Sequence, residues 1–435
     1  MSPVQVQVRE HDTLVRGTPD PTWKANRTAL PPEAFDAFET LLLDRRYDLN
    51  PVALPMKVGR QNALKLTQWV GILRAPDGTT VEVLPKTHAR PGERSEPDSL
   101  KRSRALLLRM LVATDERFRV APPADLQMAR MPLYEVVLRY VLEGIKAAVR
   151  RGIPHAYVPV QEERPGLRGR LDLPRQVRQL PARAHLLHVT YDDFLPDRPE
   201  TRLTRLTVER VAALTRDPGS RRLARELLAI LDGVPPSRNV PLDFAAWQLG
   251  RGHAHFAPLE GLCRLVLYNL NPLVAGHQAQ AQALLFDMNR VYESYVAHLL
   301  RAQHPNWHIE TQVTHEAFGQ AGDTKAFNLR PDLHITLPDK RVIIADTKWK
   351  RLEPDKAPTY DVSNADAYQM FAYSHIFQSA SVESPAQLWL LYPCLPGLPA
   401  SLPPISLPVH RLLTLVALDL ETTAELALPD TGLST

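Results

Sequence analysis

The stretch RPDLHITLPDKRVIIADTKWK, residues 330–350, decides how the C-terminal part of this chain folds. Its two apolar runs, LHITL and VIIA, flank a polar turn and predict a β-hairpin. If the turn is centred just after Asp339, residues whose numbers sum to about 678 face each other, so Asp332 lies opposite Asp346 or Thr347. Directly opposed side chains have Cβ atoms about 4.5–5.5 Å apart. The sequence therefore predicts two carboxylates side by side at the open end of the hairpin.

A lysine accompanies these carboxylates. Lys348 is two residues from Asp346, so both side chains point to the same side of the strand. Adjacent carboxylates repel unless a positive charge neutralises them. Mg²⁺ does this well because it prefers oxygen ligands, and a neighbouring lysine can orient or help deprotonate an attacking water. Asp332, Asp346 and Lys348 are thus candidates for metal-assisted phosphodiester hydrolysis. A hairpin end that is merely solvated and salt-bridged remains the alternative.

Two further positions bear on this choice. Glu293 lies at the edge of the apolar face of an expected helix and is a candidate third metal ligand, or only a boundary charge. Gln369 and Tyr373 are four residues apart, so they share one face of a later expected helix. They are candidates for holding Lys348 or contacting a phosphate.

Composition places the chain among ordinary globular proteins, since 44% of its residues are hydrophobic and 23% are charged. Its 435 residues are enough for two or three domains. Cys263 and Cys394 are far apart and lack metal-ligand spacing, which indicates free thiols in a reducing compartment. No signal peptide or membrane-spanning run is recognised, so we expect a cytoplasmic protein.

Charge is distributed unevenly. The chain has 52 basic and 48 acidic residues, a net charge of +4, yet arginine is dense in residues 164–183 and 202–225. Such patches suit phosphate backbones or an acidic protein partner. A solvated, salt-bridged surface explains them equally well at this point.

The expected elements fall into three ranges. A β-rich region, residues 1–120, contains a hairpin around Asp77-Gly78. A mainly helical region follows over residues 121–277. The last range, residues 278–435, has the order helix, three strands, helix, strand, and we expect its first helix to lie in AQALLFDMNRVYESYVAHLLRAQHP and to end before Pro305. The fold class expected is α+β multidomain, with a C-terminal α/β core made of a mixed sheet flanked by helices.

The candidate residues have the order Glu, Pro-Asp, Asp-x-Lys, Gln-x-x-x-Tyr on helix, strand, strand and helix, which resembles the PD-(D/E)xK nuclease superfamily. The segments FDMNRVYESYV, LRPDLHI, ADTKWKRL and DAYQMFAYS resemble the McrC family, the nuclease subunits of McrBC-type, 5-methylcytosine-dependent (type IV) restriction systems. The likeness extends upstream through VGILRAPDGTTVEVLPK, ERPGLRGRLDL and YDDFLPDRPETRL. It covers about residues 65–375.

This resemblance implies specific roles. Asp332, Asp346 and Glu293 would be metal ligands, with Lys348 as the catalytic lysine, and Gln369 and Tyr373 would be accessory or DNA-contacting residues. The metal would be Mg²⁺, with Mn²⁺ as an alternative. The substrate would be double-stranded DNA carrying modified cytosine.

The resemblance also implies a partner, an McrB-like AAA+ GTPase hexamer whose GTP hydrolysis this chain stimulates. The chain has no G-x-x-x-x-G-K-[ST] phosphate loop, so GTP would be used by the partner and not bound here. The N-terminal region would bind the partner's ring, and the segments ending at Lys86 and LRGRLDL are candidate contacts. Two alternatives remain: a non-cleaving regulatory scaffold of the motor, and a stand-alone RecB-like repair nuclease.

Two tempting features are set aside. His253 and His255 have strand-like spacing for a metal pair, but no carboxylate or cysteine is spaced to join them. Trp349 follows the candidate lysine, but its parity puts it on the opposite face of the strand, which favours a place in the core.

Overall fold

A computed structural model describes residues 5–24, 26–43, 52–75, 77–86, 97–114, 131–269, 282–313, 317–321, 324–377, 386–394, 398, 402–420 and 428. Packing divides the chain into two compact units, Met1–Asp115 with Ala283–Thr435, and Glu116–Gln282. The ranges 1–120, 121–277 and 278–435 stay a prediction, and the first and third contribute to the same unit. No helix in the described part of the chain is long and apolar enough to cross a bilayer.

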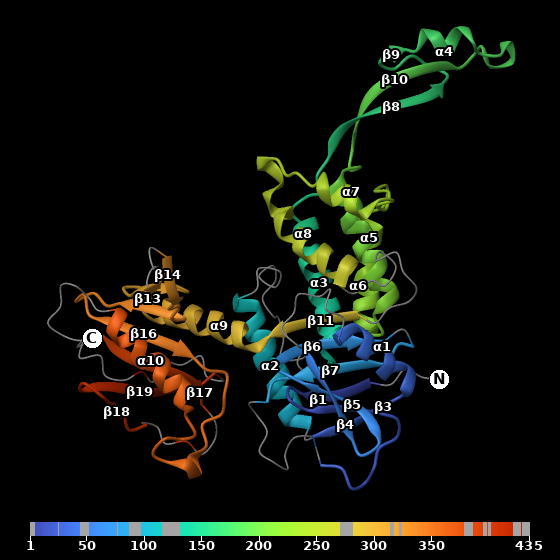
Figure 1. The fold of residues 1–435 in the computed structure, drawn as a ribbon. Coiled ribbons are helices and arrows are strands. Elements are labelled where there is room, and N and C mark those ends of the chain that lie inside the picture. Colours follow the sequence, from blue (N-terminus) through green and yellow to red (C-terminus); the bar gives the residue numbers. More distant parts are fainter. Residues whose placement is uncertain are drawn as a thin grey trace. The chain divides into compact units, whose positions relative to one another are not determined.

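The N-terminal part of the first unit is built from two four-stranded sheets (Figure 1). The strands are β1 Gln5–Arg9, β2 Thr13–Arg16, β3 Arg27–Leu30, β4 Ala53–Val58, β5 Gln61–Leu66, β6 Trp69–Arg74 and β7 Thr80–Leu84, and the helices are α1 Pro32–Leu43 and α2 Pro97–Thr114. The sheet orders are β3-β2-β5-β4 and β1-β7-β6-β11, where β11 is Gln282–Asp287 from later in the chain. The hairpin expected around Asp77-Gly78 is confirmed, because β6 and β7 pair antiparallel and Gly78 has a φ of +86°.

The C-terminal part of the first unit contains a six-stranded mixed sheet in the order β12-β15-β16-β17-β19-β18. The elements of this part are β11 Gln282–Asp287, α9 Met288–Gln303, β12 His308–Thr311, β13 Ala317–Ala321, β14 Thr324–Asn328, β15 Leu333–Thr336, β16 Val342–Thr347, a 3₁₀ turn Pro354–Lys356, α10 Asn364–Ile376, β17 Gln387–Pro393, β18 Ile405–Leu407 and β19 Arg411–Leu418. Strands β16, β17 and β19 run parallel, and the other pairs of this sheet are antiparallel. Strands β13 and β14 form a separate two-stranded sheet. The expected α+β class is confirmed.

One expected element was wrong in part. Residues 281–304 were expected to be one long helix ending before Pro305, but the helix begins only at Met288, and β11 precedes it. Buried Leu284 and Phe286 alternate with less buried neighbours, the period of a strand, and β11 extends the sheet at β6. Asp287 caps the helix, since its carboxylate accepts a hydrogen bond from the Asn289 N–H at 3.0 Å. The cap stops the helix from extending into β11.

The contact between β6 and β11 depends on a glycine. Gly71 has a φ of +136°, and a Cβ there would lie 2.1 Å from the carbonyl oxygen of Leu284. We expect Gly71→Ala to lower the free energy of unfolding by about 3 kcal/mol or more, because strain and a backbone clash combine. Gly59→Ala is the matched control, since its φ is +61° but nothing lies within 4 Å, and it should cost only about 1–2 kcal/mol. Equal shifts of the two urea midpoints would contradict this account.

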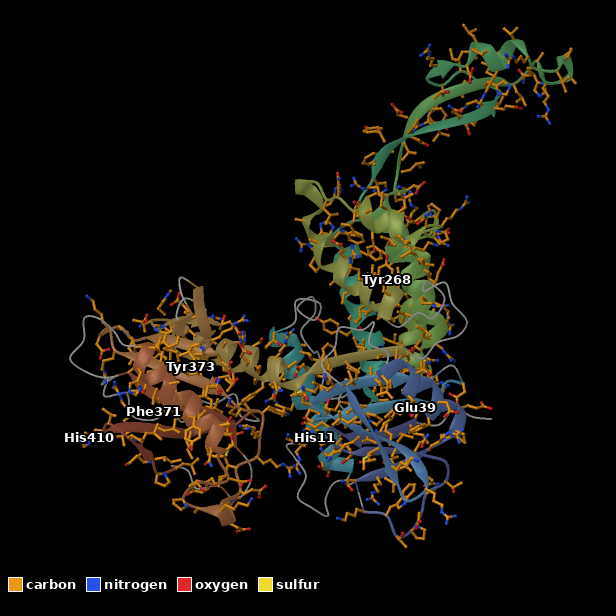
Figure 2. The ribbon with its side chains drawn as sticks, viewed as in Figure 1. His11, Glu39, Tyr268, Phe371, Tyr373 and His410 are labelled. Carbon is orange, nitrogen blue, oxygen red and sulfur yellow. The ribbon has the colours of Figure 1, made fainter. Side chains whose placement is uncertain are left out.

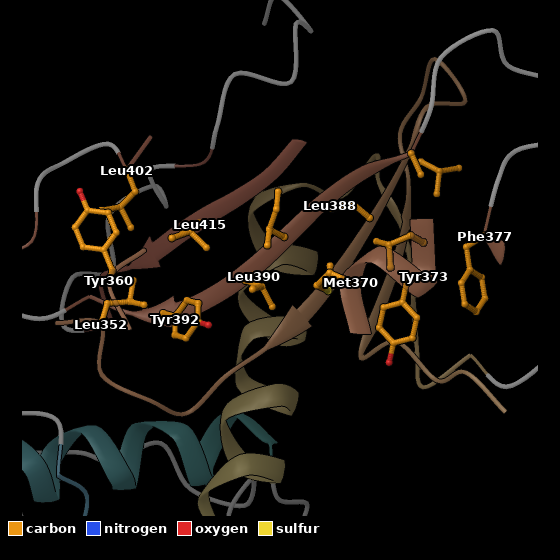
Figure 3. Packing of buried hydrophobic residues seen from close by; sticks show 14 residues of the cluster. Leu352, Tyr360, Met370, Tyr373, Phe377, Leu388, Leu390, Tyr392, Leu402 and Leu415 are labelled. Carbon is orange, nitrogen blue, oxygen red and sulfur yellow. The ribbon is translucent and has the colours of Figure 1, made fainter. Parts of the chain in front are cut away.

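The core that carries the mixed sheet lies between its strands and α10 (Figure 3). Leu388, Leu390 and Leu415 extend from neighbouring parallel strands, and Met370 and Tyr373 from α10 pack on the same cluster. Apolar side chains of this size each contribute about 1.5–3 kcal/mol when buried. This packing fixes α10 against the sheet and so determines where its polar face lies.

The second unit is mainly helical and carries a long hairpin (Figure 1). Its elements are α3 Leu133–Val149, β8 Ala156–Arg164, β9 Arg170–Leu171, α4 Leu173–Val177, a 3₁₀ turn Pro181–Arg183, β10 Leu187–Leu195, α5 Pro199–Leu214, α6 Pro218–Ile230, α7 Val240–Ala245, a 3₁₀ segment Arg251–Phe256, α8 Ala257–Arg264 and a π-helical turn Leu265–Asn269. Within this unit, β8 and β10 run away from the helices and hold β9 and α4 at the far end (Figure 1). His255 bonds the Gly152 carbonyl at 2.8 Å, a structural contact.

Candidate active site

The hairpin of β15 and β16 has the register expected from its sequence. Leu333 pairs with Ala345, and the other pairs also sum to 678. Asp332 lies just beyond this ladder, where its Oδ2 accepts hydrogen bonds from the backbone N–H and the hydroxyl of Thr347, both at 2.7 Å. These two donors hold the Asp332 carboxylate at the end of the hairpin.

Asp346 is the buried member of the carboxylate pair, with 2% of its surface exposed. Its Oδ2 is 2.6 Å from the Nζ of Lys348, and its Oδ1 accepts a hydrogen bond from Gln369 at 3.4 Å. Burial, with the negative charge of Asp332, raises the pKa of Asp346 to about 6, although Lys348 acts in the opposite direction. Because the surroundings disfavour the ionised form of Asp346, an additional positive charge next to it would be stabilising.

Lys348 is held by three acceptors. Besides Asp346, its ammonium lies 3.1 Å from the Oε1 of Gln369 and 3.4 Å from the Oδ1 of Asp366. Burial alone would lower the pKa of Lys348, but Asp346 and Asp366 outweigh it and raise the pKa, so the ammonium stays charged. Lys350 joins the same network through Asp366 at 2.8 Å.

Helix α10 supplies the accessory pair. The Nε2 of Gln369 donates to the hydroxyl of Tyr373 at 2.7 Å, and this hydroxyl donates to the carbonyl of Arg330 at 3.0 Å. Tyr373 is labelled in Figures 2 and 3, where it belongs to the packed face of α10. Through these bonds α10 is tied to the residues that lead into β15.

Glu293 reaches the site from α9. Its carboxylate is half-buried and accepts a hydrogen bond from the amide of Gln312. Burial, together with the charge of Asp332, raises its pKa. Glu293 and the hairpin carboxylates therefore share one electrostatic environment.

One cavity brings these groups together. It has a volume of about 310 Å³ and is lined by Asn289, Glu293, Asp332, Asp346, Thr347, Lys348, Trp349, Lys350 and Gln369. Of the six candidates named from the sequence, only Tyr373 is not part of this lining, and it adjoins the cavity through Gln369.

Asp366 was missed by sequence reasoning. It is 6% exposed and bonds both Lys348 and Lys350. A usable signal was present, because positions 366, 369 and 373 follow the i, i+3, i+7 spacing of one helix face. Asp366 therefore belongs with Gln369 among the groups that position Lys348.

The chemistry of the site fits a hard cation. Asp332, Asp346 and Glu293 offer carboxylate oxygens only, the ligand type that Mg²⁺ prefers. Among the described residues, no three His, Cys, Asp or Glu side chains are already gathered into a preformed metal cluster. Lys348, Thr347 and Gln312 each contact one carboxylate oxygen, of Asp346, Asp332 and Glu293 in turn.

The fold and this cavity define a class, an α+β multidomain protein with a carboxylate- and lysine-lined site at the end of a mixed sheet. The sequence model of the McrBC 5-methylcytosine restriction system component matches residues 64–393. The chain belongs to this family. No curated protein matches the sequence.

One solved structure shares the fold. The chain is similar to one in the refined half-complex from a tetradecameric assembly of Thermococcus gammatolerans McrB AAA+ hexamers with bound McrC. That likeness has a TM-score of 0.67 and 19% identity, and it covers 96% of this chain and 95% of the other. A chain of the T. gammatolerans McrBC complex matches with a TM-score of 0.46 and 22% identity, over 68% of this chain and 87% of that one.

Proposed function

We propose that this chain is the Mg²⁺-dependent DNA endonuclease subunit of a modification-dependent restriction complex. The observation that carries the proposal is the gathering of Asp332, Asp346 and Lys348 around one cavity, in the register that their sequence spacing requires. Membership of the McrBC family supports the same function. We assign the mixed sheet with α9 and α10 to the PD-(D/E)xK nuclease core.

In this proposal Asp332, Asp346 and Glu293 would hold Mg²⁺. The ion would offset charge on the scissile phosphate and lower the pKa of a bound water. Lys348, with its ammonium directed at Asp346, would orient the attacking water and offset the charge that develops as the P–O bond to the leaving oxygen breaks. Gln369 and Asp366 hold this ammonium in place.

We propose further that an McrB-like AAA+ GTPase hexamer activates cutting. The similar T. gammatolerans assembly contains McrB AAA+ hexamers with bound McrC, and this chain has no phosphate loop of its own. The partner would hydrolyse GTP, recognise modified cytosine and deliver DNA to the cavity.

The hairpin of β8 and β10 is our candidate for the surface that contacts the partner. Its far end exposes apolar side chains that contribute nothing to a core: Leu167 65%, Leu173 61%, Val177 82% and Leu180 69%. Several arginines of the same segment form internal ion pairs, as Arg168 does with Asp193 at 2.8 Å. An apolar surface with paired charges favours a protein partner over a phosphate backbone. The other candidate, the segment ending at Lys86, is largely buried.

Plasmid cleavage tests the proposal. The chain is mixed with a McrB-like GTPase, GTP and Mg²⁺ on methylated and unmethylated DNA, and each component is left out in turn. Cutting only with all components and methylation is expected. Cutting by the chain alone would support a stand-alone nuclease, and GTPase stimulation without any cutting would support the regulatory scaffold.

Asp366→Asn should slow cleavage about tenfold or more, because Lys348 and Lys350 lose the carboxylate that they share. The measurement is the initial rate of plasmid cutting at saturating Mg²⁺. Asp361→Asn is the matched control, since Asp361 pairs at 2.9 Å with Lys356 on the exposed surface. An unchanged rate for Asp366→Asn would remove this residue from the set that positions Lys348.

A further inference from the structure

A buried carboxylate from the N-terminal part of the chain, Glu10, contacts the segment that follows strand β16 of the candidate site. Glu10 follows β1, and its side chain is fully buried. Its Oε1 accepts hydrogen bonds from the backbone N–H of Lys86 at 2.9 Å and from the indole N–H of Trp349 at 2.8 Å. Burying a carboxylate costs free energy unless it is hydrogen-bonded, and these two donors reduce that cost for Glu10.

Trp349 links Glu10 to two elements that carry candidate site residues. It directly follows Lys348, lines the cavity and is 3% exposed. Its ring packs against Tyr292 at a centroid distance of 5.1 Å, and Tyr292 precedes Glu293 on α9. One indole therefore touches the segment that carries the lysine and the helix that carries the third carboxylate.

A second tether lies beside the first. The guanidinium of Arg351 donates a hydrogen bond to the backbone carbonyl of Lys86. Lys86, two residues after β7, thus contacts Glu10 through its N–H and Arg351 through its carbonyl. Residues 349–351 are fixed against the ends of β1 and β7 at two points.

Two ionisable side chains, Lys86 and His11, lie next to the Glu10 carboxylate. The Nζ of Lys86 lies 3.9 Å from its Oε2, and the Nε2 of His11 lies 3.7 Å away. Burial and the nearby Lys86 lower the pKa of His11 to about 4, so the imidazole is neutral near pH 7. Burial raises the pKa of Glu10, and the charges of Lys86 and Arg351 act in the opposite direction.

We propose that Glu10 is a positioning residue for DNA cleavage: its carboxylate fixes the Trp349 indole, and the indole fixes the segment that carries Lys348 and the helix that carries Glu293. The sheet of β1 and β7 thereby sets the geometry of the site. This inference rests on the proposed nuclease function. A displacement of a catalytic group by about 1 Å costs up to about a hundredfold in rate. Loss of the hydrogen bond between Glu10 and Trp349, the residue next to Lys348, should therefore slow cleavage.

The test compares Trp349→Phe, Glu10→Leu and Glu10→Gln with wild type in the complete cleavage assay, with partner, GTP and Mg²⁺. Trp349→Phe keeps a ring against Tyr292 but removes the N–H donor, and Glu10→Leu removes the acceptor. Both should lower kcat about tenfold or more while the KM for DNA and the stimulation of GTP hydrolysis stay unchanged. Glu10→Gln retains an oxygen acceptor for the indole and should keep most of the rate.

Glu82→Gln is the control for a merely structural role. Glu82 is also a buried carboxylate of this sheet, bonded to Arg104 at 2.6 Å and 2.7 Å and to Gln7 at 3.0 Å, and it does not line the cavity. It should lower the unfolding midpoint without changing kcat. If kcat falls in Glu82→Gln as in Glu10→Leu, or stays at the wild-type value in Trp349→Phe, the inference is overturned while the nuclease function stands. A wild type that cuts no DNA overturns both.

Discussion

Asp346→Asn is expected to lower the rate of plasmid cleavage by the complete complex at least about a hundredfold. The substitution keeps the shape of the side chain but removes one of the two hairpin carboxylates that would hold Mg²⁺, and with it the partner of Lys348 at 2.6 Å. Removing a single group that stabilises charge in a transition state commonly costs two to three orders of magnitude. Supramillimolar Mg²⁺ should not restore the rate, because the lysine is also displaced.

The same variant should fold normally. Burial and Asp332 already disfavour the Asp346 carboxylate, as its raised pKa of about 6 indicates, so a neutral amide relieves an unfavourable charge. Its unfolding midpoint at pH 7.5 should therefore be no lower than that of wild type, and GTPase stimulation should be unaffected. Asp339→Asn is the control from the other end of the hairpin, where Asp339 pairs with Arg341 at 2.5 Å. Cutting that survives Asp346→Asn would place the chemistry elsewhere in the chain.

The second large effect is expected at the β8–β10 hairpin. Replacing Leu167, Leu173, Val177 and Leu180 together by serine should raise the concentration needed for half-maximal GTPase stimulation at least about a hundredfold. Each exposed apolar side chain contributes about 1.5–3 kcal/mol if the partner buries it, and each 1.4 kcal/mol corresponds to tenfold in affinity. DNA cleavage should fall in parallel, because activation depends on binding.

The four substitutions should leave the second unit folded, since none of the α4 residues is buried and the helical core does not include them. Leu242→Ser is the matched control, a 64% exposed leucine on α7 of the same unit. A circular-dichroism melt checks folding, and titration into the GTPase measures stimulation. Unchanged stimulation by the fourfold variant would show that the partner binds another surface.

Local sequence was sufficient for the hairpin and for the direction of its side chains. The short turn between the two apolar runs sets one register, and in that register Asp332 and Asp346 end beside each other. Trp349 lies in the interior as expected, with 3% of its surface exposed, but it lies beyond the end of β16 and lines the cavity together with Lys348, so the expected separation onto opposite faces was wrong. The local sequence did not reveal that β11 is a strand, because a short apolar run fits a strand or a helix until a neighbouring strand is known.

Partners that are distant in the chain lay beyond this reasoning. Asp366 was not recognised, although it shares the helix face of Gln369, because only packing of α10 on the sheet brings that face to Lys348. Nor could the bond between Glu10 and Trp349 be expected, since 339 positions separate the two residues.

The sequence by itself determined the hairpin, its register, the carboxylate pair with its lysine, and the α+β class. Those features depend on dihedral preferences and on a side-chain period of two, which act between near neighbours in the chain. Only the tertiary structure decided which helices close the cavity, that Lys348 is held by two carboxylates and an amide, and that β1 reaches the site through Trp349. Such contacts arise from the burial of apolar faces against each other, and that burial depends on the whole chain at once.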